Sequence, residues 1–240
     1  MTQTPTESND TTQPAHPLRG ASVLLTGASG GLGSALADEL HRRGTNLTLV
    51  ARRQEPLDRL TVPGTRLAID LRTADACRQV VTEAARAGGG LDVVVNAVGV
   101  VAFGPVTDLS IDAMEELFLT NTFVSIMLTR VALGQLRPGG AIVNISGVIA
   151  EQNLPGMAAY GASKAAVRSF DEAAAREARR AEIRILDARP PHTETGLADR
   201  PIEGDAPKMP QGLQPAAVAT AICDALESGA QDLPSSDFSA

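Results

Sequence analysis

The stretch TGASGGLG (Thr26–Gly33) follows the apolar run ASVLLT (Ala21–Thr26) and precedes a segment with helical periodicity that extends through Arg43. A buried strand, a glycine-rich turn and a helix in this order can hold a nucleotide phosphate. The first turn of such a helix offers unpaired N–H groups and a partial positive charge. A glycine loop alone is weak evidence, so the rest of the chain must agree with it.

Each residue of this loop has an expected part in the cradle. Gly27 permits the tight turn, Gly31 lets the backbone approach a pyrophosphate, and Gly33 lets the helix pack closely against the strand. Ser29 and Leu32 belong to the same loop, and the hydroxyl of Ser29 is a further candidate phosphate ligand. We expect all five residues to bind a cofactor.

Strand-length apolar runs alternate with longer helical patterns along the rest of the chain. This order predicts an α/β fold: a single Rossmann-type, doubly wound parallel sheet with helices on both faces. Further strands are expected at Asn46–Val50, Thr65–Asp70, Leu91–Ala97, Ala141–Ser146 and Ile183–Ala188, with an edge strand at Gln231–Ser235; helices are expected at Thr73–Ala87, Asp112–Leu136, Met157–Arg180 and Pro215–Glu227.

The chain of 240 residues is expected to form one domain, from 18 to 235. Residues 1–17 are polar and rich in Thr and Pro, which predicts a disordered N-terminal tail, and residues 236–240 are expected to be a short C-terminal tail. Residues 190–214 carry five prolines and follow the sixth strand. In open α/β sheets ligands bind at that edge, so this segment is the expected substrate loop.

Composition excludes several kinds of function. The net charge of −7 and an aromatic content of 2% argue against a nucleic-acid surface. No apolar run reaches the roughly 20 residues of a membrane span, and the N-terminus has no signal-peptide pattern. Cys77 and Cys223 form no metal or redox motif, so we expect reduced thiols, no metal site and a cytoplasmic location.

The end of the second strand indicates which nucleotide is bound. Arg52 and Arg53 follow this strand, where an acidic residue would bind a ribose 2′-hydroxyl. Arginine instead suits a 2′-phosphate, which favours NADP(H) over NAD(H). A solvated arginine pair is the alternative interpretation.

A second motif, YGASK (Tyr160–Lys164), lies about 130 residues after the glycine loop. Tyr160 and Lys164 are four residues apart on a predicted helix and share a face. An ammonium beside a phenol favours phenolate, so we expect Lys164 to lower the pKa of Tyr160. Tyr160 would then transfer a proton as acid or base.

The two motifs, together with NAVG (Asn96–Gly99), Asn121 and IVNIS (Ile142–Ser146), resemble the short-chain dehydrogenase/reductase family from about Ala21 to Thr195. This resemblance implies a Rossmann-type sheet without a separate substrate domain, NAD(P)-dependent oxidoreductase activity on a small-molecule substrate, and assembly as a homodimer or homotetramer. Partner nucleic acids and membranes are not expected.

The resemblance also implies roles for individual residues. Asp70 and Leu71 match positions that contact adenine, and Asn96 and Gly99 match a motif beside the cofactor. Asn121 matches an asparagine whose backbone carbonyl holds a relay water. Tyr160 matches the catalytic acid/base, and Lys164 the lysine that binds the nicotinamide ribose. Pro190 opens the family's Pro-Gly segment, Thr195 matches a threonine near the carboxamide, and Thr193 is a further expected cofactor-binding residue.

The chain departs from the family pattern at three places. Ala97-Val98 replaces Asn-Ala, Pro191 replaces a glycine, and Gly147 stands where an ungapped alignment puts the catalytic serine. Ser146 is the neighbouring position and, on a strand, would point the opposite way. Three explanations remain open: Ser146 is redirected into the site; a group such as His192, Thr193 or Asn153 replaces the hydroxyl; or the chain performs different chemistry.

Together these patterns predict an NADP(H)-dependent oxidoreductase that interconverts a carbonyl and an alcohol on a small or medium organic substrate. Tyr160, Lys164 and Asn121 are its expected catalytic residues, with Ser146 as a further candidate. Two alternatives are isomerase- or dehydratase-type proton chemistry on the same scaffold, and a non-catalytic NADP-binding subunit.

Overall fold

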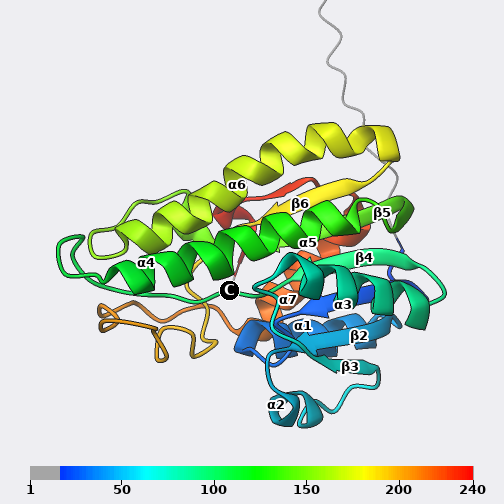
Figure 1. Ribbon diagram of the computed structural model, residues 1–240, viewed down its shortest axis with the longest axis horizontal. Helices are drawn as coiled ribbons and strands as arrows, with labels where there is room; N and C mark the ends of the chain where they lie inside the picture. The colour runs from blue at the N-terminus through cyan, green and yellow to red at the C-terminus, as the bar shows by residue number, and fades with distance from the viewer. Residues whose placement is uncertain (1–16, 240) are drawn as a thin grey trace, which may run out of the picture.

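A computed structural model describes residues 17–239, and the expected N-terminal tail therefore lies almost entirely outside the described residues. Seven strands form one parallel sheet in the order β3-β2-β1-β4-β5-β6-β7 (Figure 1), which confirms the predicted fold class. The order reverses between β1 and β4, where the chain crosses from one half of the sheet to the other. The strands are β1 (Ser22–Thr26), β2 (Asn46–Ala51), β3 (Thr65–Ala68), β4 (Leu91–Asn96), β5 (Leu136–Ile145), β6 (Arg184–Ala188) and β7 (Asp232–Leu233).

Helices cover both faces of the sheet and enclose two cores (Figure 1). On one face, α1 (Gly31–Arg42) and α7 (Pro215–Ser228) pack on β1, β2 and β6 through buried aliphatic side chains. On the other, α3 (Ala74–Ala87), α5 (Val124–Ala132) and α6 (Ala158–Ala178) pack on the same strands. The sheet is buried on both sides, as continuous apolar strands require.

The helix predicted at Asp112–Leu136 differs most from expectation. It begins as α4 (Ile111–Leu117), widens into a π-helical segment, η1 (Phe118–Phe123), and continues as α5 only to Ala132. β5 then begins at Leu136, five residues earlier than the apolar pattern indicated. A π-helical turn has no characteristic sequence period, so the pattern could not show it.

Two further differences concern short elements. The helix α2 (Gln54–Asp58) follows β2 and carried no clear periodic signal. At the C-terminus, Ser235–Asp237 form a 3₁₀ turn and Phe238 packs into the α1/α7 core at 9% exposure. Phe238 is thus part of this core, although it lies after the expected domain boundary at 235.

A row of polar side chains crosses the sheet near the carboxyl ends of its strands. Thr26, Asn96, Asn144 and Asp187 are register partners on β1, β4, β5 and β6, and all four are buried. Thr26 Oγ1 donates to Asn96 Oδ1 at 2.9 Å, and Asn96 Nδ2 donates to Asn144 Oδ1 at 3.2 Å. This polar row lies directly below the loops that leave the sheet.

Other expectations concern features of the whole domain. Cys77 and Cys223 are both buried and free, and burial raises the pKa of these thiols to about 11 and about 12. Within residues 17–239, no helix is both long enough and apolar enough to cross a membrane. The same residues contain no group of three or more His, Cys, Asp or Glu side chains placed to hold a metal ion.

Candidate functional site

The glycine loop lies at the end of β1, where three backbone segments come together. Gly27 has φ +72°, and a Cβ there would be 2.6 Å from the carbonyl group of Ala97 at the end of β4. A Cβ on Gly33 would overlap the carbonyl oxygen of Gly27. Gly27 and Gly33 are thus fixed by contacts between strand ends and helix α1, as the loop pattern predicted.

The N-terminus of α1 is open to an anion. Its N-cap residue, Gly30, has no side chain to accept a hydrogen bond from the first turn, and no acidic residue lies in that turn. The unpaired N–H groups and the helix dipole both favour a phosphate at this end. The cradle therefore fits the pyrophosphate of a dinucleotide.

The residues expected around adenine and the 2′-position lie along the ends of β2 and β3. Arg52 and Arg53 are exposed, and neither forms an ion pair with a residue that the structure describes. Asp70 is bound by Arg72, whose hydrogen bonds hold the pKa of that carboxyl below its usual value; Arg52 contributes in the same direction. Leu71 is buried at 4% exposure.

Lys164 is buried on the sheet-facing side of α6. Its Nζ donates to the backbone carbonyl of Ile145 at 2.7 Å, and the residue is 6% exposed. Burial lowers the pKa of Lys164 to about 8, while the charge of Asp187, and that of Asp171 when it is ionised, act in the opposite direction. The ammonium is thus fixed at the end of β5 and is close to its titration point at neutral pH.

Tyr160 lies one turn before Lys164 on the same helix and is partly buried. Burial raises the pKa of its phenol to about 12, the opposite direction to the sequence-based expectation. The cause is desolvation of the phenolate, and the Lys164 ammonium is held by the Ile145 carbonyl. The phenol is therefore neutral at physiological pH, as a proton donor must be.

Asn121 lies within the π-helical segment η1 and is fully buried. Its side chain accepts from Val100 N at 2.8 Å and donates to Val100 O at 3.0 Å and to Ser163 Oγ at 3.0 Å. A Cβ placed on Gly99 would lie 3.5 Å from both Asn121 Oδ1 and Lys164 Nζ. Gly99, Asn121 and Lys164 therefore meet at one point beside β4, as their assignment to one site requires.

Two candidate cofactor or relay groups have other partners in this structure. The side chain of Asn96 belongs to the polar row and also donates to Ser125 Oγ at 2.9 Å. The backbone carbonyl of Asn121, expected to hold a water, accepts from Ser125 Oγ at 2.8 Å. The Asn96 side chain therefore joins β1, β5 and α5 by hydrogen bonds beneath the site.

Ser146 and Gly147 occupy the end of β5, where the family serine was expected. Ser146 is fully buried, and its hydroxyl donates to Asp187 Oδ1 at 2.5 Å. Gly147 has φ +80° and ψ 164°, a conformation that side chains rarely adopt. A Cβ there would meet only Pro190 O, at 3.8 Å, so the site has space where a serine side chain would stand.

The substrate loop contacts the cofactor loop. A Cβ on Gly31 would overlap the backbone of Thr195, so this contact requires glycine at position 31. Thr193 Oγ1 donates to Pro191 O at 2.8 Å, and Thr193 forms a bridge with Leu213.

The other proposed serine substitutes are placed differently. The His192 ring packs on Gly212 with Nε2 3.7 Å from Glu194 Oε1, and Asn153 is exposed. Neither side chain has a contact with Tyr160 or Lys164 among the described hydrogen bonds.

The far end of the substrate loop is also attached. Ile202 N donates to Val101 O at 2.8 Å, and Phe103 N donates to Glu203 O at 3.0 Å. The Glu203 carboxylate accepts from Ser110 N at 2.7 Å and from the Ser110 hydroxyl. The loop thus crosses the carboxyl edge of the sheet from β6 to the segment after β4.

Sequence reasoning missed Asp171, a buried residue of α6 at 2% exposure. Its Oδ1 accepts from Asn144 Nδ2 at 2.8 Å, which joins α6 to the polar row. Asp171 lies seven residues after Lys164 and therefore on the same helix face. The seven-residue spacing from Lys164 could have identified Asp171, because acidic residues are seldom buried on a helix face unless they have a partner.

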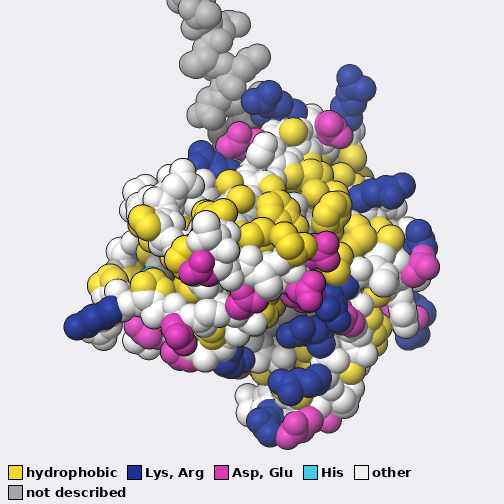
Figure 2. All heavy atoms as spheres, turned by 60° about the vertical axis from the view of Figure 1, so that its left-hand side comes forward, with side chains coloured by type: hydrophobic (Ala, Val, Ile, Leu, Met, Phe, Trp, Pro, Cys, Tyr) yellow, Lys and Arg dark blue, Asp and Glu magenta, His cyan; other side chains and the backbone are white. Residues whose placement is uncertain are grey.

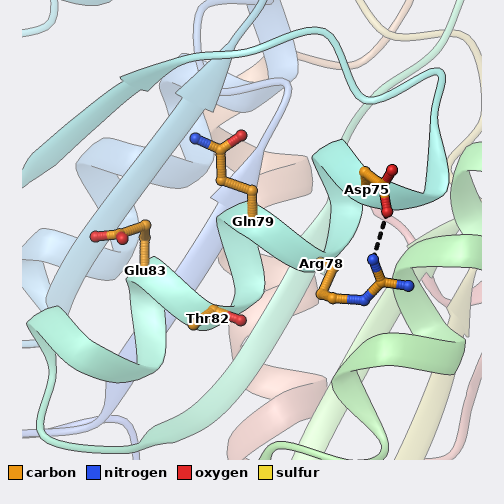
Figure 3. A pocket seen from close by; sticks show the side chains of 5 residues that line it. All are labelled: Asp75, Arg78, Gln79, Thr82 and Glu83. Carbon is orange, nitrogen blue, oxygen red and sulfur yellow. Dashed lines mark hydrogen bonds and ion pairs between the residues drawn. The ribbon is translucent and has the colours of Figure 1, made fainter.

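Two surface hollows lie outside this arrangement. One is on the outer face of α3, where Asp75, Arg78, Gln79, Thr82 and Glu83 project from successive turns and Asp75 pairs with Arg78 (Figure 3). It contains none of the expected site residues. The other is apolar and runs between the segment after β4, α4 and the start of α6, ending at Ala158 and Ala159 beside Tyr160.

Comparisons with known proteins agree with this geometry. The family profile for short chain dehydrogenase matches residues 21–205. A dehydrogenase/reductase SDR family protein 7-like from Anopheles gambiae is 31% identical over 204 residues, 79% of this chain and 64% of that protein. A hydroxynaphthalene reductase from Aspergillus fumigatus is 30% identical over 162 residues, 64% of this chain and 59% of the other. The matched part spans about three fifths of the length of these two relatives.

A crystal structure of a short chain dehydrogenase from Burkholderia cenocepacia in complex with NADP superposes with a TM-score of 0.80 and 25% identity. The match covers 92% of this chain and 98% of that protein. The profile covers the glycine loop, the Tyr160–Lys164 motif and the first part of the substrate loop in a single span. The chain therefore belongs to the short-chain dehydrogenase/reductase family.

Proposed function

We propose that this protein is an NADP(H)-dependent oxidoreductase that interconverts a carbonyl and an alcohol on a small or medium organic substrate. The observation that carries this proposal is the meeting of Lys164, Asn121 and Gly99, with Tyr160 one turn earlier on α6. The uncapped, glycine-lined N-terminus of α1 follows a strand end at the same edge of the sheet. When bound, the nicotinamide supplies or accepts the hydride. The Aspergillus relative bears the name of a reductase, which supports the same class of reaction.

In this proposal Tyr160 transfers the proton. Its neutral phenol donates a proton to the substrate oxygen during reduction, and takes one in the reverse direction. The Lys164 ammonium, held at the end of β5, stabilises the phenolate left after donation. Asn121 fixes the backbone at Val100 and holds the Ser163 hydroxyl, which in turn donates to Tyr160 O at 2.7 Å.

The cofactor preference rests on Arg52 and Arg53. Both guanidinium groups are exposed at the carboxyl end of β2 and are available to a 2′-phosphate. The related Burkholderia structure contains NADP, which supports the choice of nucleotide class. Gly27, Ser29, Gly31, Leu32 and Gly33 would hold the pyrophosphate.

A second candidate function follows from the end of β5. Gly147 has no hydroxyl, and the Ser146 hydroxyl donates its proton to Asp187. Neither of these two residues therefore has a free hydroxyl to donate to a substrate oxyanion. Proton chemistry of the isomerase or dehydratase kind needs Tyr160 but not that donor. Turnover without net NADPH consumption would identify this function, and tight NADPH binding without any turnover would identify a non-catalytic subunit.

We also propose a homodimer or homotetramer. Val106, Ile111, Phe123 and Leu154 are at least half exposed, and all lie on or beside α4, η1 and the start of α6. Figure 2 shows hydrophobic side chains gathered over a broad area of the face turned toward the viewer. Such exposed apolar area is typical of an interface between protein chains.

The cofactor preference predicts that NADPH binds at least about tenfold more tightly than NADH, a difference of about 1.4 kcal/mol. Arg52→Ala with Arg53→Ala should remove most of this ratio, because the guanidinium groups contact the 2′-phosphate. Arg59→Ala, which removes an exposed arginine paired with Glu55 on the next turn, is the matched control. Fluorescence titration measures all affinities; equal affinities in the unmodified protein would contradict the assignment.

The acid/base role predicts that Tyr160→Phe lowers kcat by about 10²–10⁴-fold with NADPH affinity nearly unchanged. Lys164→Ala should reduce both. In the unmodified protein, ketone reduction should fall as pH rises through about 8, because Lys164 loses its proton there. NADPH oxidation over a ketone panel gives these rates, and a tenth or more of the activity remaining in Tyr160→Phe would exclude the phenol as the acid.

The geometry at the end of β5 predicts that Ser146→Ala changes kcat less than about threefold, because its hydroxyl is bound to Asp187. Gly147→Ala should destabilise the protein by about 1–3 kcal/mol through backbone strain. Gly147→Ser has the same strain but restores a hydroxyl, so it should reduce generic ketones faster than Gly147→Ala. A loss near 10²-fold in Ser146→Ala would show instead that Ser146 is the oxyanion donor.

The proposed assembly predicts a mass of two or four times the 24.9 kDa chain by light scattering at micromolar concentration. Phe123→Asp with Ile111→Asp should reduce this mass, because charges would enter the apolar interface. A 24.9 kDa species in the unmodified protein would refute the assembly.

A further inference from the structure

Two buried carboxyl groups beneath α6 have no part in the chemistry described above. Asp171 is 2% exposed and Asp187 is 4% exposed. Asp171 lies two helical turns after Lys164 on the same face of α6, and Asp187 lies opposite Asn144 on the neighbouring strand β6. Carboxyl groups are seldom buried so fully unless a partner stabilises them.

The partners of Asp187 favour its ionised form. Ser146 Oγ donates to Oδ1 at 2.5 Å, and Arg189 Nη1 donates to Oδ2 at 2.6 Å. Burial raises the pKa of Asp187, while these hydrogen bonds act in the opposite direction. Arg189 is itself held by Asp232 at 2.7 Å and by Glu151, so its guanidinium is fixed beside Asp187.

Asp171 differs in having one neutral partner. Asn144 Nδ2 donates to Oδ1 at 2.8 Å, and Oδ2 has no hydrogen-bond partner among the described residues. An unpaired oxygen of a buried carboxylate is far more costly than that of a neutral acid. Burial raises the pKa of Asp171 well above its ordinary value, and the charge of Asp187 acts in the same direction.

Lys164 and Asp187 are held by two successive residues, Ile145 and Ser146. Lys164 Nζ donates to the carbonyl of Ile145, and the next residue, Ser146, donates its hydroxyl to Asp187. The titratable groups around Lys164 are Tyr160 and Asp171 on α6 and, from β6, Asp187 with Arg189 behind it. From β5, Lys164 contacts the carbonyl of Ile145. The nearby residues of β5, its end and η1 are also neutral: Asn121, Asn144 and Ser146.

We propose that Asp187 is a positioning residue whose carboxylate is the buried counter-charge of the Lys164 ammonium, and that Asp171 beside it is a neutral carboxylic acid. The inference rests on the proposed function only in giving Lys164 a catalytic role. Burial alone drives Lys164 toward its neutral form, and one nearby anion opposes this. The site thereby keeps a charged lysine at neutral pH inside a desolvated pocket.

The chain is well suited to a direct test, because its lysines are only Lys164 and Lys208. In protein carrying ¹³C at lysine Cε, Lys208→Arg assigns the two NMR signals, and no substrate is needed. Lys164 should titrate near pH 8 in the unmodified protein. In Asp187→Asn it should titrate below about pH 7, and in Asp171→Asn it should remain near the unmodified value.

Asp232→Asn is the matched control, because it removes another carboxylate partner of Arg189 whose side chain is 62% exposed. It should leave the Lys164 titration unchanged. The proposal is overturned if Asp187→Asn leaves Lys164 at its original titration point, if Asp171→Asn lowers it, or if Asp232→Asn lowers it as much as Asp187→Asn. Because this measurement needs no turnover, its failure is distinguishable from failure of the proposed function in Tyr160→Phe.

A second measurement applies even if Asp187→Asn does not fold. The infrared carbonyl band of a protonated carboxylic acid should be present at neutral pH and absent in Asp171→Asn. Folding raises the pKa of Asp171, so its protonated form contributes to the free energy of unfolding. This contribution is complete below about pH 4, the ordinary pKa of an aspartic acid, and is lost as the pH rises. Asp171→Asn lacks this loss, so its Tm relative to the unmodified protein should rise between pH 4 and 7. The assignment of Asp171 as a neutral acid is overturned if the Tm difference between Asp171→Asn and the unmodified protein is the same at pH 4 and pH 7. It is also overturned if the infrared carbonyl band persists in Asp171→Asn.

Discussion

The need to satisfy buried hydrogen-bonding groups at the carboxyl edge of the sheet governs much of this structure. Thr26, Asn96, Asn144 and Asp187 lie side by side on four strands where a wholly apolar row would be simpler to bury. Each polar group must find a partner, and the partners come from different helices: Ser125 from α5 and Asp171 from α6. The cofactor loop, which begins at Thr26, and the helix that carries Tyr160 are thus joined by one chain of hydrogen bonds. A change in any member leaves a neighbour unsatisfied, at a cost of about 1–3 kcal/mol.

Much of the fold was predictable because its signals are local. Alternating strand and helix patterns predicted the parallel sheet, the glycine loop marked the turn after β1, and YGASK marked helix α6. The π-helical turn around Asn121 and the early start of β5 were not predictable, since both arise from packing against other elements. The burial of Phe238 likewise depends on a core built from α1 and α7, which no feature of the last five residues announces.

The site was predictable in its residues but less so in its electrostatics. Spacing placed Tyr160 and Lys164 on one helix face, but it suggested a lowered phenol pKa where burial raises it. Strand alternation does not apply to Ser146 and Gly147, because both follow the end of β5 and Gly147 has φ +80°. The Ser146 hydroxyl is bound to Asp187. Whether Ser146 contributes to catalysis stays a prediction. The pairing of Asp171 with Asn144 joins residues 27 positions apart, and a single sequence carries no record of such contacts.

The substrate loop touches the cofactor cradle at one end, where the Thr195 backbone lies over Gly31, and is fastened near Ser110 at the other. Two ligands that share such a contact cannot bind independently if either one moves the loop. Thermodynamic linkage then makes the coupling reciprocal: the factor by which a bound nucleotide changes substrate affinity equals the factor by which substrate changes nucleotide affinity. The loop between residues 190 and 214 is therefore a place where substitutions remote from the nucleotide can alter how tightly it is held.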